Sequence, residues 1–135
     1  MIIKYIIAIL LFSAIILFHE LGHFLLAKAN GIRVNEFSLG LGPTIVGFTK
    51  GETKYSIKLL PFGGACMMEG EDSQSNDDRS FQKKSVWARI SVVAAGPVFN
   101  FIMAFVLAVI ILGNIGISTP IVAQVEDGYG AQAAG

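Results

Sequence analysis

This sequence carries little charge and almost no cysteine. Charged residues occupy 15% of its 135 positions, and ten basic residues balance ten acidic ones. The balance gives no reason to expect a nucleic acid as a partner, because nucleic-acid binding relies on an excess of basic residues. The single cysteine, Cys66, excludes a disulfide within the chain, and we expect it to be a small buried apolar residue. The sequence contains no internal repeat and no low-complexity tract.

Apolar residues dominate instead. They form 53% of the chain, and the mean hydropathy of +0.64 is typical of a membrane protein. A bilayer-spanning helix needs about 20 apolar residues, and the sequence predicts two such helices, over 2–27 and 90–112. Lys4 gives the first helix the look of a signal peptide. The apolar run nevertheless continues to Ala27 without a convincing cleavage site, so we expect a retained span.

The first predicted helix contains a His-Glu-x-x-His motif. A helix turns about 100° per residue, so His19 and His23 share one face and can offer two imidazole nitrogens to one ion. A catalytic zinc site uses three protein ligands plus water, and Glu20 is placed to act on that water as a general base. Titratable groups are costly inside a membrane unless a cation and a wet cavity compensate them. The motif therefore predicts Zn²⁺ ligands at His19 and His23 and a catalytic Glu20, with structural histidines as the alternative.

The distribution of basic residues predicts the orientation of the chain. Nine of the ten Lys and Arg lie between the two spans, and Lys4 alone lies on the other side. Cytoplasmic segments are rich in Lys and Arg, so we expect a multi-pass protein of the cell membrane with a cytoplasmic central segment and both chain ends extracytoplasmic.

In this orientation Asn100 of the second helix reaches a depth similar to that of the two histidines. We therefore count Asn100 as a candidate catalytic residue that donates a hydrogen bond to the scissile carbonyl or its oxyanion. The alternative is an interhelical hydrogen bond that fixes packing. Gly96, one turn earlier, is expected to allow close helix contact.

The central segment has strand character over 34–68, with strands expected at 34–39, 44–48 and 53–60 between Gly- and Pro-rich turns. Alternation predicts that Tyr55, Ile57 and Leu59 share the buried face of the last strand. We expect a membrane-associated β-hairpin, with a small cytoplasmic sheet as the alternative. A linker is expected over 69–89, and the charges within 70–80 are expected to be solvated. These parts form one membrane core, 1–113, followed by a connector and a strand at 121–125.

Four blocks of the sequence resemble the site-2 protease family of intramembrane zinc metalloproteases, and in particular its bacterial branch that cleaves anti-sigma factors. The blocks are FHELGH at 18–23, FSLGLGP at 37–43, PFGG running to EGED at 61–72, and AGPVFNF at 95–101. They follow one another in the family's order and cover most of the chain. The resemblance implies that His19 and His23 bind zinc, that Glu20 is the general base and that Asn100 lines the active site.

The resemblance also implies a β element over 34–68 that guides substrate and, over 114–135, the start of an extracytoplasmic PDZ-like domain. Substrates would be single-span membrane proteins such as anti-sigma factors or signal-peptide remnants, held in the lipid bilayer. The family's third zinc ligand, an Asp in a Leu-Asp-Gly motif on a later helix, has no counterpart in these 135 residues. We therefore expect this chain alone to bind zinc weakly and to cleave nothing. Two other interpretations remain open: a metal-binding membrane protein or transporter, and a non-catalytic scaffold.

Overall fold

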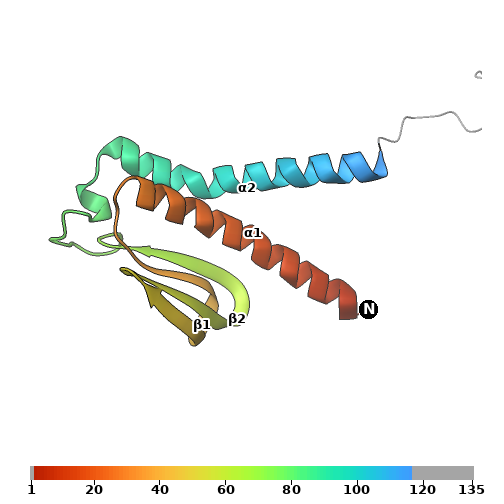
Figure 1. Ribbon diagram of the computed structural model, residues 1–135, viewed down its shortest axis with the longest axis horizontal. Helices are drawn as coiled ribbons and strands as arrows, with labels where there is room; N and C mark the ends of the chain where they lie inside the picture. Colours follow the sequence, from red (N-terminus) through yellow and green to blue (C-terminus); the bar gives the residue numbers. More distant parts are fainter. Residues whose placement is uncertain (1, 117–135) are drawn as a thin grey trace, which may run out of the picture.

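The computed structural model describes residues 2–116 and contains two long helices and one β-hairpin (Figure 1). In chain order these are α1 (Ile2–Ala29), β1 (Val34–Lys50), β2 (Thr53–Met68), the short 3-10 helix η1 (Phe81–Lys83) and α2 (Val86–Ile115). Both α1 and α2 are long and apolar enough to cross a membrane. The predicted order of helix, β element and helix is confirmed. The expected strand at 121–125 and the start of a PDZ-like domain lie outside the described residues.

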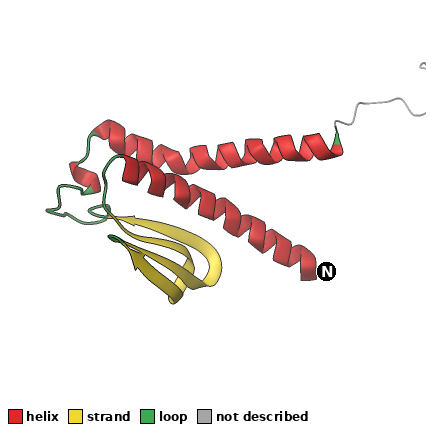
Figure 2. Ribbon diagram, viewed as in Figure 1, coloured by secondary structure: helices red, strands yellow, loops and turns green. Residues whose placement is uncertain are grey.

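Helix α1 lies between α2 and the hairpin, and it contacts both (Figures 1 and 2). The two helices pack closely where α1 ends and α2 begins, and they diverge towards the N-terminus of α1 and the far end of α2 (Figure 1). The helix backbones approach closely at Gly22, where an added Cβ would lie 2.5 Å from the backbone oxygen of Ala95. The His-Glu-x-x-His motif therefore lies in the tightly packed half of the helix pair.

Both helices are longer than predicted, because their capping residues lie outside the apolar runs. Helix α1 ends two residues later than expected, at a Schellman motif: Gly31 has a φ of 66°, and the amides of Gly31 and Ile32 bond to the carbonyls of Lys28 and Ala27. Helix α2 begins four residues earlier, since the Ser85 side chain accepts a hydrogen bond from the first turn. Hydropathy alone does not register these caps.

The hairpin is two long antiparallel strands that bend, rather than the three short strands predicted. Residues 36–39 of β1 have partners on both sides, in segments 64–67 and 54–57 of β2. Gly40, Gly42 and Gly63 have φ values of 83–89°, where glycine avoids the strain that other residues meet. The predicted turns at these glycines are therefore bends within continuous strands. Within residues 2–116 no strand pairs with the outer side of segment 64–68, so this side is an edge of the sheet.

The predicted burial of the strand over 53–60 is wrong in part. Tyr55 does pack, in an aromatic cluster with Phe24, Phe37 and Phe48 at centroid distances of 5.0–6.3 Å. Ile57 and Leu59, however, are more than half exposed, whereas Ser56 is buried and donates a hydrogen bond to Glu36.

The reason is that residues 54–57 pair on both sides within the bent sheet, so a satisfied hydroxyl can be buried while aliphatic side chains face outward. Other exposed apolar side chains of the hairpin are Leu41, Ile45, Val46, Phe48, Leu60 and Phe62. An outer surface of this kind suits lipid better than water.

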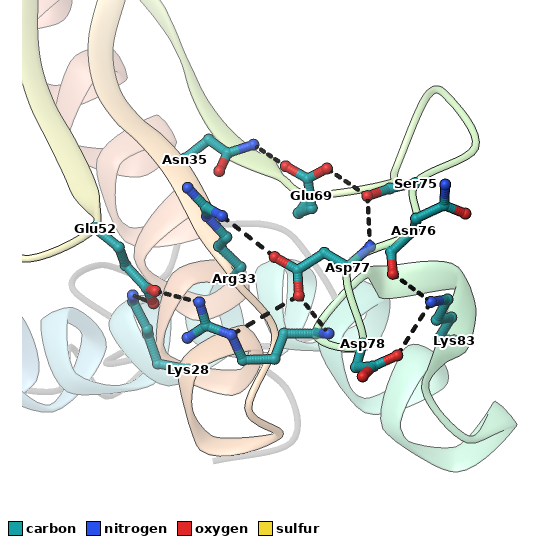
Figure 3. A network of polar contacts seen from close by, with 11 residues as sticks. Lys28, Arg33, Asn35, Glu52, Glu69, Ser75, Asn76, Asp77, Asp78 and Lys83 are labelled. Carbon is teal, nitrogen blue, oxygen red and sulfur yellow. Dashed lines mark hydrogen bonds and ion pairs between the residues drawn. The ribbon is translucent and has the colours of Figure 1, made fainter.

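A polar network joins the linker after β2 to the end of α1 and the start of β1 (Figure 3). Glu52, in the β1–β2 turn, forms ion pairs with Lys28 at 2.8 Å and with Arg79 at 2.7 Å, and Asp77 pairs with Arg33 at 3.2 Å. Hydrogen bonds from Lys28 and Arg79 hold the pKa of the Glu52 carboxyl below its ordinary value. The expectation that the linker charges are simply solvated is therefore wrong for Asp77 and Arg79, which tie the linker down, whereas the Asp78 side chain is 99% exposed.

The small buried core lies at the same end of the molecule as this polar network, near the end of α1 and the start of β1. It joins one residue or more from each of α1, β1, β2 and α2: Ala27, Ile32, Val34, Cys66, Met68 and Val92. The prediction for Cys66 is confirmed, since its side chain is 8% exposed. Burial, with the nearby Glu20 charge adding to it, raises the pKa of the Cys66 thiol to about 12.

Candidate metal centre

The two histidines of the motif project from α1 towards the start of α2. Their ring centroids are 4.8 Å apart and their planes cross at 77°. Both residues are half-buried. The i, i+4 spacing thus brings the two imidazoles together, as predicted from the sequence.

Both imidazole rings are fixed from α2 through their Nδ1 atoms. His23 Nδ1 lies 2.7 Å from the backbone oxygen of Val92, and His19 Nδ1 lies 3.2 Å from Asn100 Nδ2. A carbonyl oxygen can only accept, so His23 carries its proton on Nδ1 and keeps a free lone pair on Nε2. This is the tautomer that a metal ligand with Nε2 coordination requires.

The Nε2 atoms of both rings converge on Gly96. A Cβ added to Gly96 would lie 2.4 Å from His23 Nε2 and 2.6 Å from His19 Nε2. Both Nε2 atoms therefore lie close to one point beside the α2 backbone. Zinc bonds to imidazole nitrogen at about 2.0–2.1 Å, so two rings this close together can share one ion placed away from that backbone. The sequence predicted a small residue for helix contact at Gly96. In the structure the missing Cβ makes room for the two histidines.

The donor set therefore fits zinc as two of its ligands. A catalytic zinc site takes three protein ligands. Within residues 2–116 no group of three or more His, Cys, Asp and Glu side chains is arranged to hold a metal ion.

Glu20 lies beside strand β2. With His23 it lines a cavity of about 660 Å³ whose other walls include the 64–68 segment of β2 and the acidic start of the linker. A Cβ on Gly64 would lie 3.1 Å from Glu20 Cγ, so the Glu20 side chain passes close to the hairpin backbone. A carboxylate beside a cavity that reaches the polar linker has a route for water and protons.

Asn100 and His19 line a second cavity, of about 500 Å³, between α1 and α2. Its walls are almost entirely apolar and include Ile15, Pro97 and Leu107. The Asn100 side chain makes the interhelical contact to His19 described above, while its Oδ1 atom is buried without a hydrogen-bond partner among the described residues. Asn100 thus lies beside the metal-binding candidates, as its predicted depth suggested.

Two contributors were missed from the sequence. The Val92 carbonyl that fixes His23 belongs to the backbone, and no residue type signals such a role. Gly64, which lets Glu20 approach the sheet, lies in a Gly63-Gly64 pair that was interpreted only as a break in a strand.

The motif and the fold together define a class: a chain with a zinc-peptidase His-Glu-x-x-His sequence in an apolar helix that packs on a second apolar helix and a β-hairpin. Comparison with known families is consistent with this class. The model of peptidase family M50 matches residues 7–132, and the chain belongs to this family.

Several bacterial proteins that bear the name "Putative zinc metalloprotease" are similar to the chain. One from Clostridium acetobutylicum is 47% identical over 96% of the chain, and one from Clostridium perfringens is 44% identical over 95%. A third, from Thermotoga maritima, is 36% identical over 94%. The chain spans 38% of the length of each Clostridium protein and 26% of the Thermotoga protein.

Proposed function

We propose that this chain forms part of an intramembrane zinc protease of the site-2 type, which cleaves the transmembrane segments of single-span membrane proteins. His19 and His23 serve as two zinc ligands and Glu20 as the general base. The observation that carries this proposal is that both Nε2 atoms lie beside Gly96 of α2, while Glu20 and His23 line one cavity. The third ligand comes from sequence outside this chain. Membership of family M50, with relatives named as zinc metalloproteases, supports the proposal.

The chemistry follows from the residues around the cavity. When bound, zinc lowers the pKa of water towards about 7 and polarises a carbonyl. Glu20 removes a proton from the attacking water as its oxygen bonds to the scissile carbonyl carbon. Glu20 then delivers the proton to the amide nitrogen as the carbon–nitrogen bond breaks. The Glu20 side chain passes close to Gly64 of β2, where an added Cβ would lie 3.1 Å from Glu20 Cγ.

The hairpin has a role in holding the substrate. A substrate helix hides its carbonyls in internal hydrogen bonds, so it must unwind before it can be cut. The 64–68 segment has a free sheet edge and also lines the cavity with Glu20 and His23. An unwound segment that adds to this edge through main-chain hydrogen bonds would lie beside the catalytic groups.

The orientation proposed from the basic residues places the hairpin and linker on the cytoplasmic side. In this orientation the exposed apolar side chains of the hairpin lie in the cytoplasmic leaflet. The cavity lined by Glu20, His23 and the start of the linker then faces the cytoplasm. Anti-sigma factors and signal-peptide remnants are the kinds of single-span protein that we propose as substrates.

A membrane assay tests the proposal. The full-length protein is expressed with a tagged single-span reporter whose span contains Gly and Pro near the expected cut, and with a matched poly-Leu reporter. We expect cleavage of the first, little cleavage of the second, and none by His19→Ala or His23→Ala. Equal cleavage of both reporters would refute the unwinding step. Histidine-dependent zinc uptake with both reporters intact would instead support a transporter, and zinc binding with neither activity would support a scaffold.

A further inference from the structure

The amide of Asn100 has one partner and one orphaned atom. Its Nδ2 atom lies 3.2 Å from His19 Nδ1, and its Oδ1 atom is buried with no hydrogen-bond partner among residues 2–116. An amide nitrogen can only donate, so in this orientation His19 Nδ1 accepts and the ring proton lies on Nε2. That tautomer cannot bind a metal through Nε2. His23, whose Nδ1 faces the carbonyl of Val92, is already in the metal-ready tautomer.

A half-turn of the amide resolves the mismatch. The amide oxygen and nitrogen have nearly the same shape, so rotation about the terminal bond exchanges their positions. Oδ1 would then accept the proton of His19 Nδ1, and Nε2 would be free on the side that faces Gly96. Either orientation leaves one amide atom unpaired in the described part of the chain. Metal binding through Nε2 requires the rotated orientation, so amide orientation and metal binding are coupled.

We propose that Asn100 is a positioning residue that holds His19 in its metal-binding tautomer, rather than a donor to the substrate. The proposal rests on the proposed function, because it takes His19 to be a zinc ligand. Neither amide heteroatom is available to a substrate carbonyl: one contacts His19 and the other is buried. The neighbouring cavity, lined by His19, Pro97 and Leu107, is almost wholly apolar, which is unlike a site that presents a polar donor.

Three variants of the full-length protein test this role through zinc affinity, measured by competition with a chromophoric chelator. Asn100→Leu removes the acceptor at similar size, and we expect zinc affinity to fall about 10- to 100-fold, as for other partners of metal-bound histidines. Asn100→Asp keeps an acceptor for Nδ1–H but loses the donor, and it should retain wild-type affinity or exceed it. His19→Ala is the reference for loss of the ligand itself.

The outcomes separate the two proposals. If His19→Ala binds zinc as tightly as the wild type, the proposed metal site is wrong. If His19→Ala binds weakly while Asn100→Leu binds like the wild type, the positioning role is overturned. Should Asn100→Leu fail to fold, ¹⁵N spectra of histidine-labelled, zinc-loaded wild-type protein decide the matter. We expect His19 Nδ1 to be protonated in the wild type and to keep its hydrogen-bonded chemical shift in Asn100→Asp. An unprotonated Nδ1 would overturn the proposal.

Discussion

Replacing Gly96 with alanine gives a sharp test of the histidine geometry. The new Cβ would lie 2.4 Å from His23 Nε2 and 2.6 Å from His19 Nε2, whereas ordinary contact begins at 3.4 Å. To restore ordinary contact, the His23 ring must move away by 1.0 Å and the His19 ring by 0.8 Å. Metal–ligand bonds tolerate deviations of only about 0.2 Å. The required displacement is several times larger, and α2 backbone atoms cannot yield easily because the helices are in contact there.

We expect Gly96→Ala to weaken zinc binding at least tenfold and to abolish reporter cleavage, while the protein still inserts and folds. Gly113→Ala is the matched control, since it lies in the same helix with nothing within 4 Å of the added Cβ. Alanine is the better helix former by about 1 kcal/mol, so the control should bind zinc normally and unfold at an equal or higher temperature. Wild-type zinc affinity in Gly96→Ala would refute the placement of the two Nε2 atoms.

Three further predictions concern the packing around the site. Gly22→Ala should lower the free energy of unfolding by about 1–3 kcal/mol, because its Cβ would lie 2.5 Å from the Ala95 backbone. An unchanged unfolding temperature in detergent would contradict that close approach. Cys66, with its pKa raised to about 12, should resist maleimide near neutral pH in the native protein and react after denaturation, and rapid native labelling would show an open core. The pKa of Glu52 is lowered by its bonds to Lys28 and Arg79, so its stabilisation is present above the ordinary value of 4.5 and is lost as pH falls through the lowered pKa. Glu52→Gln should therefore destabilise the protein near pH 7, by about 1 kcal/mol or less, but not at strongly acidic pH. Asp78→Asn is the control, because the Asp78 side chain is 99% exposed, and it should change stability little at either pH. Equal destabilisation by Glu52→Gln at both pH values would be evidence against the ion pairs.

The helical part of the fold was largely predictable because each of its signals is local. Apolar runs of more than 20 residues identified both helices, and the four-residue spacing of His19 and His23 fixed their common face. The helix ends were missed because Ser85 and Gly31 act through caps that hydropathy does not register. Local rules place the motif but not its exact surroundings.

The hairpin was harder to predict, since its burial depends on pairing between distant segments. Alternation assigned Ile57 and Leu59 to a buried face, yet segment 54–57 pairs on both sides and buries Ser56 instead. The same limitation applies to the metal centre. That Gly96 faces the histidines, that Val92 fixes His23 and that Gly64 touches Glu20 all follow from helix and strand packing across 40 residues or more of sequence.

The arrangement also explains why a β-hairpin accompanies the helix pair. Lys28 and Arg79 hold the β1–β2 turn through Glu52, and the core around Val34, Cys66 and Val92 joins the hairpin to both helices. Segment 64–68 is therefore fixed beside Glu20 and His23. The sheet edge and the candidate catalytic residues thus lie on one cavity, as the proposed main-chain capture of a substrate requires.

The most direct test of the central claim is to replace Glu20 with glutamine in the full-length protein and to measure bound zinc and reporter cleavage in the same membranes. Glutamine keeps the shape of the side chain but cannot take a proton, and the zinc ligands His19 and His23 remain. We predict wild-type zinc content with cleavage reduced by a factor of about 10²–10⁴, the usual contribution of a general base. Cleavage at the wild-type rate would contradict the assignment of Glu20 and the mechanism built on it.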